Sequence, residues 1–196
     1  MKKILLIISF FTVMALGESS FEVDGVYGGM TVKELIAKKL TKKNGEYKEN
    51  ILVGKLDTAS SMMYGGLFTG DLIGYTTNIL DKKARISILY TKKSKLICAV
   101  IVEWINLSMD ESSSLIFSIE KSLNSKYTEG KDIDTKEFAG SPLGGKQWKP
   151  NENTKIYAYT KISPNMALIP TVIYIDNKYL QRSKDELKPA EKTNKL

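Results

Sequence analysis

The chain has 196 residues, with 29 basic and 22 acidic side chains, one cysteine and no histidine. Without histidine, neither a Ser-His-Asp nor a Cys-His catalytic site can be built, and the commonest transition-metal ligand is missing. One cysteine excludes an intramolecular disulfide and argues against a zinc site. We therefore expect no catalytic residues, no cofactor and no metal site.

Residues 1–17 are predicted to be a secretory signal peptide. Two lysines precede an uncharged, mostly apolar run over residues 4–16, and Ala15 and Gly17 place small side chains before a cleavage point. The run is shorter than the roughly 20 residues that a membrane-spanning helix needs, although a retained N-terminal anchor is the alternative. We predict cleavage after Gly17 and a secreted or periplasmic protein that does not span the membrane after signal cleavage.

The positive charge of the predicted mature chain points to no nucleic-acid site. Removal of the first 17 residues leaves 27 basic and 22 acidic side chains, a net charge near +5. Arg85 and Arg182 are the only arginines, and the lysines are scattered along the chain. Because base-edge recognition favours arginine, we expect no sequence-specific nucleic-acid binding.

The first part of the chain predicts a helix followed by antiparallel strands. Thr31 and Glu34 match a capping box, which predicts a helix over residues 31–42. Strand patterns follow at 51–56 and 73–80, then at 84–90 and 96–104. The last two segments should form a hairpin. Residues 96–104 are apolar on both faces, so we expect a central strand in which Cys98 is buried and unreactive.

A second helix-and-strand series follows. Ser108 and Glu111 form another capping box and predict a helix over 110–128. A glycine-containing stretch over 131–153 is interpreted as a loop, and residues 155–161 and 167–175 as a hairpin. The charged tail, 181–196, is expected to be disordered or a frayed helix.

These elements predict an α+β fold with two helix-plus-antiparallel-sheet halves, at 18–105 and 106–180, after the signal peptide and before the tail. The triplets Tyr90–Lys92 and Tyr159–Lys161 suggest an internal repeat, although a chance match is the alternative. This element order, over roughly residues 25 to 180, resembles the tandem fold of the family of the β-lactamase inhibitor protein. The resemblance implies a protein-binding module with a concave sheet. It assigns no functional residue of that family to a position in this chain.

Two apparent catalytic or metal motifs fail on their context. Ser118 and Lys121 have the S-x-x-K spacing of serine hydrolases, but the companion motifs of that class are missing. Asp132, Asp134 and Glu137 could gather oxygen ligands for calcium, but a calcium loop needs more carboxylates and a central glycine.

The stretch MMYGGLFTGDLIGY, residues 62–75, is the most unusual in the chain. Gly65 and Gly70 have the spacing of a phosphate-binding loop, but Asp71 stands where that loop needs lysine. We interpret the stretch as a bent strand and its connection at the edge of the sheet. Tyr64 and Phe68 could be core residues at this bend or anchors for a protein partner.

Taken together, these features favour an exported, non-catalytic binding or interaction module of the bacterial envelope. Its partner would be another envelope or extracellular protein, with Tyr64 and Phe68 as the speculative contacts. One alternative is an envelope hydrolase that uses carboxylate or Ser/Lys chemistry, which would require a pocket with converging titratable groups. Another is a structural or assembly factor of the envelope without a small ligand.

Overall fold

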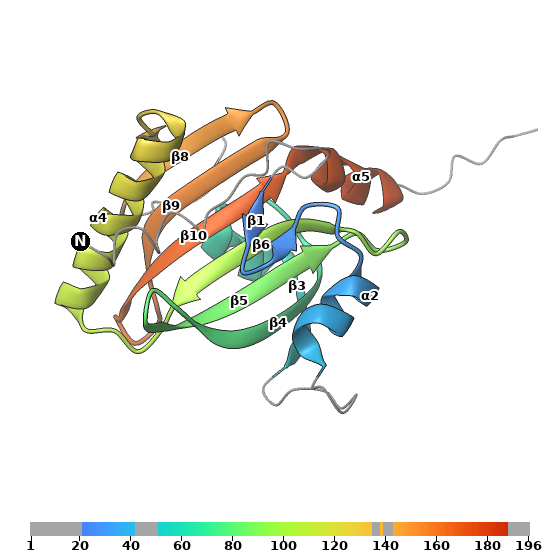
Figure 1. Ribbon diagram of the computed structural model, residues 1–196, viewed down its shortest axis with the longest axis horizontal. Helices are drawn as coiled ribbons and strands as arrows, with labels where there is room; N and C mark the ends of the chain where they lie inside the picture. The colour runs from blue at the N-terminus through green and yellow to red at the C-terminus, as the bar shows by residue number, and fades with distance from the viewer. Residues whose placement is uncertain (1–20, 42–50, 135–137, 139–142, 188–196) are drawn as a thin grey trace, which may run out of the picture.

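The computed structural model describes residues 21–41, 51–134, 138 and 143–187, and its main element is one curved, eight-stranded antiparallel sheet (Figure 1). The strand order is β3-β4-β5-β6-β10-β9-β8-β7. The strands are β3 (Leu52–Leu56), β4 (Gly70–Ile79), β5 (Lys82–Tyr90), β6 (Ile97–Trp104), β7 (Lys131–Asp132), β8 (Leu143–Asn151), β9 (Thr154–Ile162) and β10 (Leu168–Asp176).

Shorter elements surround this sheet. A two-stranded ribbon pairs β1 (Glu22–Val23) with β2 (Val26–Tyr27). The helical segments are α2 (Val32–Leu35), its π-helical continuation η1 (Ile36–Leu40), α3 (Thr58–Ser61), the 3₁₀ turn η2 (Met62–Tyr64), α4 (Met109–Tyr127) and α5 (Asn177–Leu187).

The predicted α+β fold with two helix-plus-sheet halves is wrong. The described chain is mostly β, and the sheet is continuous because β6 pairs with β10, with Val102 opposite Val172 and Ile101 opposite Ile173. All eight residues of β6 are buried, as are the last seven of β10. A strand enclosed on both faces and both edges needs two neighbouring strands, so these two lie side by side at the centre of one sheet.

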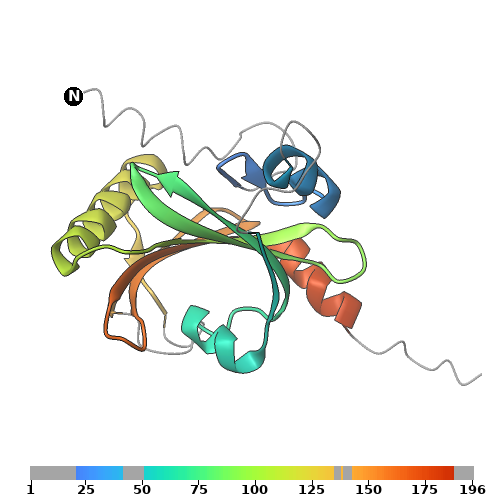
Figure 2. The same ribbon diagram turned by 90° about the horizontal axis from the view of Figure 1, so that it is seen from below.

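The two faces of the sheet carry different cores. The larger core lies on the convex face, under α4, α2 and the β1–β2 ribbon, and includes Trp104, Ile119 and Phe21. The second core lies on the concave face, where α3 and η2 sit within the curve of the sheet (Figure 2). Its members include Phe68, Phe138 and Tyr157.

Both predicted capping boxes are confirmed. The Thr31 and Ser108 side chains accept hydrogen bonds from the backbone N–H groups of Glu34 and Glu111, and the glutamate side chains accept from the backbone of the caps. The predicted hairpin over 84–104 and the buried central strand are also present. Cys98 is 2% exposed, in agreement with the prediction.

One prediction for the second part of the chain needs correction, and for the tail the helical alternative is observed as far as Leu187. The stretch interpreted as a loop contains β7 and β8, because Trp148 is buried and its indole N–H donates to Asn124 Oδ1 of α4 (3.1 Å). The part of the predicted tail up to Leu187 is helical, in α5. Glu186 accepts hydrogen bonds from the backbone N–H groups of Lys93 and Ser94, which ties α5 to the β5–β6 turn.

The predicted signal peptide lies outside the described residues. Within the described part of the chain, no helix combines the length and the apolar character needed to cross a membrane.

Candidate functional site

The site begins with a carboxylate in an apolar strand. Glu103 lies near the end of β6, with its side chain on the concave face of the sheet, and is 1% exposed. The pairing register places it opposite Arg85 of β5 and Thr171 of β10. A buried carboxylate is costly unless hydrogen bonds and opposite charges compensate for the lost water, so Glu103 requires partners.

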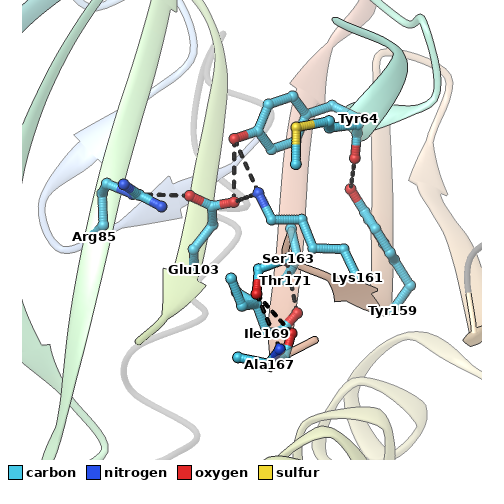
Figure 3. A network of polar contacts seen from close by, with 10 residues as sticks. Tyr64, Arg85, Glu103, Tyr159, Lys161, Ser163, Ala167, Ile169 and Thr171 are labelled. Carbon is cyan, nitrogen blue, oxygen red and sulfur yellow. Dashed lines mark hydrogen bonds and ion pairs between the residues drawn. The ribbon is translucent and has the colours of Figure 1, made fainter. Parts of the chain in front are cut away.

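Three side chains supply these partners (Figure 3). Glu103 Oε2 accepts a hydrogen bond from Arg85 Nε at 2.9 Å. Glu103 Oε1 accepts from the Tyr64 hydroxyl at 3.1 Å and forms a buried ion pair with Lys161 Nζ. Each carboxylate oxygen therefore has at least one charged donor, and the group is held by strands on both sides and by η2.

Tyr64 connects the network to η2, the 3₁₀ turn of which it is the last residue. Lys161 Nζ donates to the Tyr64 hydroxyl at 3.3 Å and lies 4.6 Å from the centre of its ring, a cation–π distance. Burial raises the pKa of Tyr64 well above its ordinary value, and the negative charge and hydrogen bond of Glu103 act in the same direction. The hydroxyl is therefore kept protonated as a donor to Glu103.

Residues 58–64, which form α3 and η2, are called the strap below. A second bond attaches the strap to the sheet, since the Tyr159 hydroxyl donates to the Met63 carbonyl at 3.1 Å. The strap ends at Gly65, whose φ of 73° is left-handed. A Cβ at Gly65 would lie 2.4 Å from the Phe138 ring, so both backbone conformation and space require glycine here.

The two predicted contact residues have different surroundings. Phe68 is 5% exposed and belongs to the concave core, which matches the core alternative for this residue. Tyr64 is half-buried, and its hydroxyl is engaged with Glu103. The large apolar side chains that the strap exposes are instead those of Met62 (52% exposed) and Met63 (42%).

The interpretation of the glycine-rich stretch as a bent strand is only partly right. Met62–Tyr64 is a 3₁₀ turn, and β4 begins at Gly70 as the second strand from the edge. Sequence reasoning missed Glu103, Arg85 and Lys161. A signal for Glu103 was present, because a glutamate within an otherwise apolar strand requires a buried partner.

The described residues of the two rejected motifs lie elsewhere, on α4 and around β7. Ser118 is exposed on α4, and its hydroxyl donates to the Ser114 carbonyl at 2.8 Å. Asp132 forms an ion pair with Lys146 at 2.6 Å, while Glu137 lies outside the described residues. The described residues contain no group of three or more acidic or sulfur side chains placed to hold a metal ion.

The arrangement around Glu103 is suited to holding the strap rather than to proton transfer. A general base must reach the proton of a bound substrate, whereas Glu103 is 1% exposed and its carboxylate is engaged by Tyr64, Arg85 and Lys161. The network therefore fixes the strap in one position on the concave face.

Comparison with known proteins gives no further assignment: no family model, no curated protein and no solved structure matches this chain. The resemblance of element order to the family of the β-lactamase inhibitor protein stays a prediction.

Proposed function

We propose that this protein is an exported, non-catalytic binding module that recognises another envelope or extracellular protein through the outer side of the strap. The observation that carries the proposal is the pair of exposed methionines, Met62 and Met63, on the strap. Hydrogen bonds of Tyr64 to Glu103 and of Tyr159 to the Met63 carbonyl attach the strap to the sheet. Export rests on the predicted signal peptide at residues 1–17.

The attachment of the strap supports a binding role because it places the exposed side chains before a partner arrives. Tyr64 and the Met63 carbonyl hold the backbone, while the methionine side chains remain free to adapt. A binding segment that is already ordered loses less conformational entropy on association. Methionine is flexible and polarizable, and it is common at surfaces that accommodate a protein partner.

The hydrolase alternative receives less support from the same residues. Its carboxylate candidate, Glu103, is buried and engaged by three donors, and its serine candidate, Ser118, lies on the exposed side of α4. A carboxylate or Ser/Lys enzyme requires these groups to converge on one pocket.

The test is an affinity pull-down from the host envelope with a photo-activated cross-linker. A variant with M62S and M63S should lose the captured partner, whereas M109S should retain it. Met109 is the matched control because it is 66% exposed on α4. Equal capture by both variants would refute the strap as the binding surface. Intact-mass analysis of the exported chain should also show a start at Glu18, and a mature pool that begins at Met1 would refute the export step.

A further inference from the structure

The two edges of the large sheet are protected very differently. β7, at one edge, has only two residues, Lys131 and Asp132, and both are charged and exposed. β3, at the other edge, has five residues and exposes Leu52 (48%) and Val53 (75%). Short length and charge are the usual protection of a sheet edge against pairing with another chain. β7 has both forms of protection, and β3 has a single lysine, Lys55.

Within the described residues, β3 pairs with β4 alone. On an edge strand, every second residue directs its N–H and C=O groups away from the neighbouring strand. Within the described part of the chain, the outer edge of β3 therefore offers backbone donors and acceptors together with exposed apolar side chains. The chemistry that fits both is another extended strand.

We propose that β3 is a homodimer interface, in which the β3 strands of two copies pair antiparallel about a twofold axis at Gly54. The sequence of the strand, LVGKL, is self-complementary in this register. Leu52 lies opposite Leu56 of the second copy on the concave face, and Val53 lies opposite Lys55 on the convex face. No like charges meet, and the exposed half of Leu52 is covered by an apolar neighbour.

Gly54 is suited to the position on the axis. A Cβ built there meets only the Leu72 side chain, at 3.8 Å, so the monomer has room for a larger residue. Directly opposite residues of antiparallel strands have Cα atoms about 4.5–5.5 Å apart, within the range of a disulfide. In the proposed dimer, a cysteine at position 54 would therefore lie opposite the cysteine at position 54 of the second copy.

This geometry gives a test that depends on register. Under mild oxidation, G54C should form a covalent dimer rapidly, whereas V53C should not. Val53 is 75% exposed, but in the dimer it lies opposite Lys55, and Val53 of the second copy lies on the diagonal at about 7–8 Å. The native Cys98 is buried and does not compete. Equal cross-linking of the two variants would indicate random collision and overturn the proposal.

A second measurement uses charge. V53K places the new lysine opposite Lys55 of the second copy, whereas V53E places a carboxylate there. Each substitution removes the same apolar side chain, and both should leave the monomer folded. The twofold axis repeats the contact between residue 53 and Lys55, so the V53K dimer contains two like-charge pairs and the V53E dimer contains two opposite-charge pairs. In sedimentation equilibrium, the V53K dimer should therefore be roughly tenfold weaker than the V53E dimer. A wild-type chain that stays monomeric over the concentration series overturns the proposal. The same holds if the β3 edge of that monomer binds an extended peptide instead of a second copy.

Discussion

Removing the charge of Glu103 should destabilise the fold more than any substitution of an exposed ion pair. In Glu103→Gln, Lys161 would remain 9% exposed without its carboxylate, and Arg85 would lose its partner. Breaking a buried ion pair from one side costs about 3–5 kcal/mol. Because the Arg85 side chain is 38% exposed and keeps contact with water, we expect the low end, about 3 kcal/mol.

The measurement is urea unfolding followed by circular dichroism, with Lys161→Met and the double variant completing a cycle. The double variant should be more stable than the sum of the single effects predicts, by at least about 1 kcal/mol, because no buried charge is left unpaired and Arg85, at 38% exposure, keeps its contact with water. Lys146→Met is the control, since its partner Asp132 is 88% exposed, and it should leave the free energy of unfolding nearly unchanged. A Glu103→Gln effect as small as that of Lys146→Met, with additive single effects, would refute the reasoning.

Three further outcomes follow from the described contacts. Phe68→Ala should lower the free energy of unfolding by about 3–5 kcal/mol in the same assay, and an effect below 1 kcal/mol would contradict its place in the core. Burial raises the pKa of the Cys98 thiol to about 12, so a thiol reagent should modify the native protein only as fast as it unfolds; rapid modification would contradict this placement. A hydrogen bond from Lys82 and the Ser108 cap lower the pKa of Glu111 from 4.5 to about 2. The stability that Glu111 contributes should therefore be present above pH 4.5 and be lost as the pH falls towards 2, so Glu111→Gln should flatten this part of an acid-unfolding profile. An unchanged profile would exclude the contribution.

Local signals in the sequence were sufficient for some elements and insufficient for others. The capping boxes at Thr31 and Ser108 predicted helix starts, because both partners of the cap lie within four residues of each other. β8 had no such signal. Its glycines and proline favour a loop, and it becomes a strand through pairing with β9 and the burial of Trp148 against α4.

The candidate site shows the same limit. Glu103 and Lys161 are 58 residues apart, and no local pattern indicates which lysine would reach which glutamate. The pairing of β6 with β10 brings them together, and that pairing was the topological step that the sequence prediction lacked. The exposed methionines of the strap could be identified only once Tyr64 was seen to point inward.

The central position of β6 has a consequence for synthesis of the chain. β6 ends at Trp104, but its second neighbour, β10, is complete only at Asp176. At typical synthesis rates of 5–20 residues per second, about seventy further residues take roughly 4–14 s. During that interval one edge of β6, whose eight residues are all buried in the folded protein, has no native neighbour, so we expect the nascent chain to be prone to aggregation at Ile97–Trp104. Glu103, which later anchors the strap, is the one charged side chain in that strand, and it would act during this interval as a gatekeeper against strand-to-strand association.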